Sequence, residues 1–286
     1  MKRIFLVPLL FCLLGIEAAG GGKVFETRTL KSAVLKMERK YAVYLPEGYD
    51  ETDLSYPVLY LLHGSGDDHT GWVQFGQVQH IADRAVTEGK ATPMIVVMPD
   101  ANTGVKGYFN DIEGNFNYED FFFKELIPHV EKTYRVRAER QYRAISGLSM
   151  GGGGTLFYSL HHPEVFAAAA PLSATTGNWE LEQFKARHGE KRFAEAQLNA
   201  HFNRHNIENI LKTASGDDLK KIREIRWYIS CGDDDFLYEG NSLLHILFRK
   251  NNIPHEFRIK DGAHTWSYWR SELPLVMEFV SRSFTR

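Results

Sequence analysis

Short, mainly apolar runs recur along the chain, and each ends at a turn that contains glycine or aspartate. The four clearest runs are Pro57–Leu62, Pro93–Met98, Tyr142–Ser146 and Ile225–Ser230. Runs of this length and composition are typical of strands that are buried on both faces of a parallel sheet. Two more strands are expected at Lys40–Leu45, which alternates in polarity, and at His255–Ile259, which reads as an edge strand.

Helical patterns lie between these runs. They are expected at Val78–Gly89, Tyr118–Tyr134, Gly151–His162, Ser242–Asn251 and Leu273–Ser283. Strands that alternate with helices predict an α/β fold, with a mostly parallel central sheet and helices on both of its faces. Ligands of such sheets bind beyond the carboxyl ends of the strands, so the loops at those ends are where a functional site is expected.

The segment Thr175–Ile222 interrupts this alternation. It is polar and prone to form helices, for example at Leu181–Gly189 and Arg192–Phe202, and it contains no run typical of a buried strand. We expect a helical insertion of the single domain, placed before the strand Ile225–Ser230. The insertion either caps the site or packs on the surface without touching a substrate.

The first residues have the features of an export signal. Lys2 and Arg3 precede the apolar stretch Ile4–Ile16, and small residues follow at Ala18–Gly21. The stretch is shorter than the roughly 20 residues that span a bilayer. We expect residues 1–21 to be a signal peptide and residues 22–286 to form one exported domain, periplasmic or extracellular, that is not bound to a membrane after cleavage. A retained anchor and a lipoprotein are the alternatives.

Composition and charge exclude several classes of protein. The 286 residues are 43% hydrophobic and 24% charged, which excludes a disordered chain, a collagen-like chain or a disulfide scaffold. The net charge of −2 gives no basic field for nucleic acid. Of the two cysteines, Cys12 lies in the expected leader, so Cys231 is left alone and no internal disulfide is expected.

The strongest chemical signal is the pentapeptide Gly147-Leu148-Ser149-Met150-Gly151, a Gly-x-Ser-x-Gly motif. It stands between an expected strand and an expected helix, the context in which this motif forms a sharp turn that presents a nucleophilic serine. Only small neighbours allow the strand and the helix to approach so closely. The alternative is a glycine-rich turn with a chance serine. A phosphate loop is excluded because no Gly-Lys-Ser/Thr follows the glycines.

A serine needs a base, and the base needs a group that orients it. His264 is the expected base because it follows the last strand and precedes the C-terminal helix. His161 and His162 are expected to cap a helix, and His63 is expected to pack or to form hydrogen bonds beside the oxyanion loop. The acid should follow the strand Ile225–Ser230, where Asp233, Asp234 and Asp235 are adjacent. Physical reasoning leaves the choice among the three open, and a cation such as Ca²⁺ is an alternative occupant of this cluster.

Two further roles are assigned from position. The backbone amides of Met150 and Ser65 are expected to form an oxyanion hole, Ser65 because it lies in the glycine loop after Pro57–Leu62. Several aromatic residues also lie near these loops, and most are expected to pack in the core. Trp72 and Trp266 are the candidates for stacking on a sugar or phenolic ring.

At these residues the sequence resembles a known family, the α/β-hydrolase esterases of the feruloyl and acetylxylan esterase type, related to S-formylglutathione hydrolases and mycolyltransferases. The resemblance covers roughly Leu30–Phe279. It is carried by Leu61-Leu62-His63-Gly64, Asn117–Phe122, Gly147–Gly152, Cys231-Gly232-x-x-Asp235 and Gly262-Ala263-His264.

The resemblance implies the α/β-hydrolase fold, and it aligns the acid with Asp235. It also implies a secreted serine carboxylic ester hydrolase that needs no cofactor or metal. Its substrate would be a small-molecule or polysaccharide ester, with feruloyl or acetyl groups on plant polysaccharide. An acyltransferase, a thioesterase like S-formylglutathione hydrolase and a non-catalytic carbohydrate-binding protein are the alternatives. The motifs carry no information on an oligomer.

Overall fold

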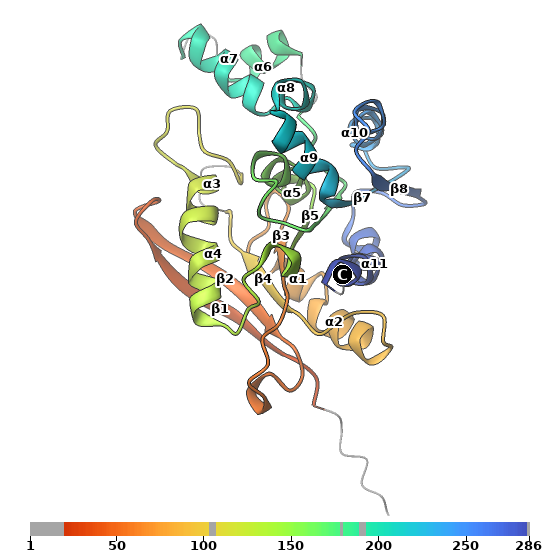
Figure 1. Ribbon diagram of the computed structural model, residues 1–286. Coiled ribbons are helices and arrows are strands. Elements are labelled where there is room, and N and C mark those ends of the chain that lie inside the picture. The colour runs from red at the N-terminus through yellow and green to blue at the C-terminus, as the bar shows by residue number, and fades with distance from the viewer. Residues whose placement is uncertain (1–19, 103–106, 178–179, 189–192, 285–286) are drawn as a thin grey trace, which may run out of the picture.

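A single eight-stranded sheet forms the centre of the fold (Figure 1). The computed structural model describes residues 20–102, 107–177, 180–188 and 193–284. The strand order is β1-β2-β4-β3-β5-β6-β7-β8. β2 pairs antiparallel with both β1 and β4, and all other neighbours are parallel. The strands are β1 Lys23–Ser32, β2 Met37–Leu45, β3 Val58–Leu62, β4 Ile95–Pro99, β5 Arg143–Leu148, β6 Ala168–Leu172, β7 Arg226–Gly232 and β8 His255–Lys260.

Six of these strands were predicted from the sequence, and two were not. β1 was missed because its sequence, KVFETRTLKS, is polar and mostly exposed at the edge of the sheet. β6 was missed because its sequence, AAAPL, lacks the β-branched and aromatic residues of a typical strand, although all of it is buried. β8 lies at the opposite edge, as predicted.

The helices fill the connections between the strands. They are α1 Gly71–Gln74, α2 Val78–Thr87, α3 Tyr118–Phe121, α4 Ile127–Thr133, α5 Met150–His161, α6 Leu181–His188, α7 Glu195–Arg204, α8 Ile207–Thr213, α9 Gly216–Glu224, α10 Tyr238–Lys250 and α11 Trp266–Phe284. A π-helical turn, Phe122–Leu126, joins α3 to α4, and short 3₁₀ turns lie at Tyr49–Glu51 and Arg140–Tyr142. α11 begins at Trp266 rather than at the predicted Leu273, so Trp266 lies on a helix and not on a loop.

Each face of the sheet is covered by its own apolar core, as predicted for an α/β fold with helices on both faces of the sheet. Val58, Tyr60 and Leu62 of β3 belong to the cluster that includes residues of α3, α4, α5 and α10. The alternate residues, Leu59 and Leu61, belong to the cluster that includes residues of α2 and α11. Figure 1 shows α2 and α11 together on the side of the sheet away from α4. Continuous burial of β3 explains its unbroken apolar sequence.

The predicted insertion contains α6 to α9. Its second half is part of the main core, because Ile207, Leu211 and Ile222 are buried there. Its first half has a separate small cluster of Phe184, Leu198 and Phe202. The insertion is thus fixed to the body of the protein through α8 and α9. α6 packs on α7, which also contacts α8, and Figure 1 shows α6 and α7 at its top.

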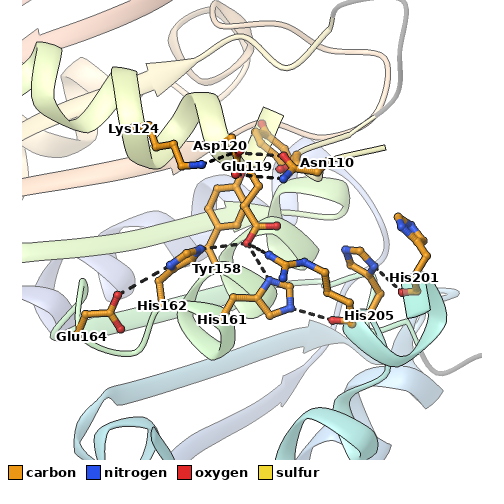
Figure 2. Close-up of polar contacts among 12 residues, drawn as sticks. Asn110, Glu119, Asp120, Lys124, Tyr158, His161, His162, Glu164, His201 and His205 are labelled. Carbon is orange, nitrogen blue, oxygen red and sulfur yellow. Dashed lines mark hydrogen bonds and ion pairs between the residues drawn. The ribbon is translucent and has the colours of Figure 1, made fainter. Parts of the chain in front are cut away.

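A buried carboxylate also links the insertion to the core. Glu119 of α3 is 1% exposed, and its Oε1 accepts hydrogen bonds from His161 Nδ1 at 2.9 Å, from His162 Nε2 at 3.1 Å and from Arg204 of α7 at 2.8 Å. Figure 2 shows both histidine rings directed at Glu119. Burial raises the pKa of Glu119, but the two histidine bonds and the Arg204 charge outweigh burial and lower it. His161 and His162 therefore bind a carboxylate rather than cap α5.

Most of the predicted signal peptide, residues 1–19, lies outside the described residues. The described chain begins at Gly20, and the amide of Gly22 donates to Asp83 of α2 at 2.8 Å. Across the part of the chain that the structure describes, no helix combines the length and apolarity that a membrane crossing needs.

Candidate active site

Ser149 lies at the sharp turn between β5 and α5. Its backbone has φ 54° and ψ −114°, a strained conformation for a residue other than glycine. The turn is possible because its flanking residues lack side chains. A Cβ on Gly147 would lie 2.6 Å from the carbonyl oxygen of Gly151, and a Cβ on Gly151 would lie 2.6 Å from the carbonyl oxygens of Leu62 and His63. The sharp turn and the close approach that the motif predicts are both present.

His264 and Asp235 complete a chain of hydrogen bonds to Ser149. Nε2 of His264 lies 2.9 Å from Oγ of Ser149, and Nδ1 lies 2.8 Å from Oδ2 of Asp235. The three side chains come from loops at the carboxyl ends of β5, β7 and β8. Asp235 is fully buried, whereas the side chain of His264 is 19% exposed. A base that faces both a hydroxyl and a carboxylate can remove the hydroxyl proton while the carboxylate stabilises the resulting imidazolium.

Hydrogen bonds keep Asp235 ionised. Burial raises the pKa of this carboxyl, but the bonds from His264, from the Leu237 amide and from the Ser173 hydroxyl outweigh burial and lower it. Ser173 also accepts a hydrogen bond from Trp269 Nε1 at 3.1 Å, and its φ is 44°. Ser173 was not considered in the sequence analysis because it directly follows β6, the strand that lacks a strand-like sequence.

The two neighbouring carboxylates have other surroundings. Asp233 and Asp234 are exposed and lie near Asp261, and the oxygens of the three come within 4.8 Å of one another. Asp233 accepts a hydrogen bond from the Gly262 amide at 3.0 Å, and the Asp234 amide donates to the Gly262 carbonyl at 3.0 Å. Both residues therefore hold the loop that carries His264, and among the three adjacent aspartates it is Asp235 that contacts the imidazole.

The amides proposed for the oxyanion hole lie close to Ser149. Met150 is the first residue of α5, so its amide has no acceptor within the helix. Ser65 follows Gly64, whose Cβ would lie 3.6 Å from the Cβ of Ser149. Within the described part of the chain, neither amide has a hydrogen-bond acceptor. Unpaired amides beside the reacting hydroxyl are what stabilisation of an oxyanion requires.

His63 fixes the loop that contains Gly64 and Ser65 through hydrogen bonds of both its ring nitrogens. The Ala101 amide donates to its Nε2 at 2.9 Å, so this nitrogen carries no proton and Nδ1 donates to the Gly64 carbonyl at 2.8 Å. Burial lowers the pKa of His63, which favours the same neutral ring. The sequence analysis predicted that His63 packs or forms hydrogen bonds here, and it does both.

The prediction for Trp72 is wrong. Trp72 is fully buried in α1, and its Nε1 donates to the Leu62 carbonyl at 2.9 Å, so it offers no face to a substrate. Trp266 is partly exposed and packs edge-on against Trp72, with ring centroids 5.1 Å apart. Its role in substrate binding stays a prediction.

Phe236 is an aromatic residue that the sequence analysis did not consider. It follows Asp235, its side chain is 72% exposed, and its ring lies 4.5 Å from the ring of His264. The only sequence signal was its position directly after the acid, since one exposed phenylalanine after three aspartates has no pattern of its own.

Comparisons with known proteins identify relatives of this chain. A solved structure described as a ferulic acid esterase superposes with a TM-score of 0.80 and 37% identity, over 92% of this chain and 99% of that one. An endo-1,4-beta-xylanase/feruloyl esterase of Xylanibacter ruminicola is 39% identical over 47% of this chain and 19% of its own length. An acetyl esterase of Caldicellulosiruptor saccharolyticus is 24% identical over 78% of this chain and 83% of its own.

The fold and these relatives define the chain as a carboxylic ester hydrolase with the α/β-hydrolase fold. It belongs to the family described as "Putative esterase", whose model matches residues 32–278. The family resemblance seen in the sequence is thereby confirmed. The chain spans only about a fifth of the length of the Xylanibacter relative, so that protein's full set of activities does not transfer to it.

Proposed function

We propose that this chain is an exported serine esterase that removes feruloyl or acetyl groups from plant polysaccharide. The observation that carries the proposal is the hydrogen-bonded series Ser149, His264 and Asp235. Relatives named feruloyl esterase and acetyl esterase support the two acyl groups. The proposal of export rests on the leader-like residues 1–21.

In the proposed mechanism, Nε2 of His264 takes the proton of Ser149 while Oγ attacks the ester carbonyl. The oxyanion that forms accepts hydrogen bonds from the amides of Met150 and Ser65. The imidazolium then gives its proton to the alcohol oxygen as the bond between that oxygen and the carbonyl carbon breaks. Water attacks the acyl-enzyme by the same route and releases the acid and the free serine.

We further propose that residues 22–286 form one domain in which residues 175–222 cap the site. The cap proposal is supported by the start of the insertion, where the Thr175 amide donates to the Ser149 carbonyl at 3.1 Å. The Gly153 amide donates to that carbonyl as well, at 2.9 Å. A movement of the insertion at Thr175 would therefore change the hydrogen bonding of the turn that carries the nucleophile.

A panel of esters tests the proposed activity. Hydrolysis of methyl ferulate, p-nitrophenyl acetate and acetylated xylan is measured for wild type and for Ser149→Ala, which is the control for background hydrolysis. We expect turnover of at least one ester and a loss on the order of 10³-fold or more in kcat for Ser149→Ala. Preference for S-formylglutathione would instead indicate a thioesterase, and transfer to an added alcohol in preference to water would indicate an acyltransferase. Binding of xylan without turnover of any ester would indicate a carbohydrate-binding protein.

A further inference from the structure

Two aromatic rings contact the imidazole of His264. Trp269 is 5% exposed and meets the imidazole edge-on, with ring centroids 4.9 Å apart. The ring of Phe236 has its centroid 4.5 Å from that of the imidazole and is tilted by 48°. Trp269 belongs to the core between the sheet and α11, whereas Phe236 belongs to neither of the two large cores nor to the small cluster of the insertion. Phe236 is thus the solvent-facing partner of the base.

Folding does not account for the position of Phe236. Burial of an aromatic side chain stabilises a protein, and Phe248 of α10, for example, is fully buried. Phe236 stays 72% exposed. Single exposed apolar residues are common on protein surfaces, so exposure alone indicates nothing. The second observation is its contact with His264, because this contact places an exposed aromatic ring next to the imidazole that transfers the proton.

The chemistry of the site says which part of a substrate would lie there. The imidazolium protonates the leaving alcohol, so the alcohol oxygen must come within hydrogen-bond distance of Nε2 of His264. A ring in contact with the imidazole is then next to the alcohol portion of the ester. An aromatic side chain offers such a group a large, rigid apolar face, and the C–H face of a sugar ring is well suited to pack against it.

We propose that Phe236 binds the alcohol portion of the substrate and makes the enzyme select esters of sugars over esters of small alcohols. This inference rests on the proposed esterase function and deepens it, because it assigns the recognition of carbohydrate to the leaving-group side. Trp266 instead contacts Trp269, with ring centroids 5.4 Å apart.

The test compares two esters that share one acyl group. Methyl ferulate and a feruloylated arabinoxylan oligosaccharide form the pair; if the panel shows preference for acetate, methyl acetate and an acetylated xylo-oligosaccharide replace them. The variants are Phe236→Ala, Phe236→Leu and Phe236→Trp. Tyr238→Ala is the matched control, because Tyr238 is also aromatic and 53% exposed and lies two residues further along.

We expect Phe236→Ala to lower kcat/KM for the sugar ester about tenfold more than for the methyl ester, mainly through KM. Phe236→Trp should keep the selectivity of wild type, Phe236→Leu should lose most of it, and Tyr238→Ala should not change it. An equal loss on both esters would show that Phe236 acts only through His264 and would overturn the inference, as would an unchanged ratio. If wild type hydrolyses neither ester of either pair, the proposed function itself is wrong.

Discussion

Ser149 and His264 are 115 residues apart in the chain, yet Nε2 of His264 lies 2.9 Å from Oγ of Ser149. The parallel strands bring them together. The carboxyl ends of β5 and β8 point to the same end of the sheet, and the turn or loop after each strand carries one of the two residues. Asp235, after β7, lies between them in the chain and contacts the far side of the imidazole. The order serine, acid, histidine along the chain follows from the order of β5, β7 and β8, whose carboxyl ends carry these residues.

Replacement of the acid should separate Asp235 from its neighbours. Asp235→Asn keeps the size of the side chain but removes the charge that stabilises the imidazolium, so we expect kcat to fall by roughly 10³- to 10⁴-fold. Asp234→Asn is the matched control, and a change within about twofold is expected because Asp234 is exposed and does not contact His264. Steady-state kinetics with the preferred ester measures both. A larger loss in Asp234→Asn than in Asp235→Asn would mean that the acid is misassigned.

A side chain at Gly151 should force α5 away from β3. In Gly151→Ala the new Cβ would lie 2.6 Å from two carbonyl oxygens, both of backbone that cannot easily shift. We expect the free energy of unfolding to fall by about 3 kcal/mol. Gly216→Ala is the control, because its Cβ would meet nothing within 4 Å in α9 and should stabilise by about 0.5 kcal/mol. Denaturant unfolding monitored by circular dichroism distinguishes them, and equal stabilities would contradict the packing described for the turn.

The buried carboxylate of Glu119 should make stability depend on pH. Its pKa is lower in the folded protein than the ordinary value of 4.5, so the ionised group stabilises the fold above about pH 4.5 and this contribution is lost as pH falls further. We expect Glu119→Gln to lower the free energy of unfolding by about 2 kcal/mol at pH 7, since one of its partners, Arg204, is half-exposed.

Unfolding measured at pH 7 and at pH 4 tests this expectation, because the difference between wild type and Glu119→Gln should shrink at the lower pH. Glu164→Gln serves as the control. Glu164 is 55% exposed and lies 3.8 Å from His162, so its loss should have little effect. A difference that stays constant with pH would mean that Glu119 does not stabilise the fold through its charge.

Cys231 should not react in the folded protein. Burial, together with the nearby charge of Asp235, raises the pKa of its thiol to about 12, and the thiolate is the reactive form. In protein that lacks residues 1–21, where Cys231 is the lone cysteine, a thiol reagent such as DTNB at pH 8 should titrate no thiol until denaturant is added. Rapid reaction of the native protein would indicate that the loop after β7 is open.

The sequence predicted the parts of the fold whose residues reflect burial directly. The apolar run of β3 and the strained turn at Ser149 are examples, because a doubly buried strand must be apolar and the turn must have glycines on both sides. β6 was not predictable in this way, since close contact with α5 favours small residues there and removes the usual strand signal: a Cβ on Gly152 would lie 2.6 Å from the Leu172 carbonyl.

Side-chain exposure was the part of the site that sequence could not provide. Trp72 follows Gly71 and Phe236 follows Asp235, and nothing in these neighbours shows that Trp72 is buried whereas Phe236 is left in solvent. The choice of Asp235 required the resemblance to a family, because three adjacent carboxylates differ only in the direction in which the turn after β7 points them.

The most direct test of the account is covalent labelling with a fluorophosphonate, followed by mass spectrometry of the intact protein and its peptides. A fluorophosphonate reacts with a serine that a neighbouring base has activated. Wild type should gain one adduct, and the modified peptide should contain Ser149. Ser149→Ala, folded as judged by circular dichroism, should gain none. An adduct on another residue, or labelling of Ser149→Ala at the wild-type rate, would contradict the claim that Ser149 is the nucleophile.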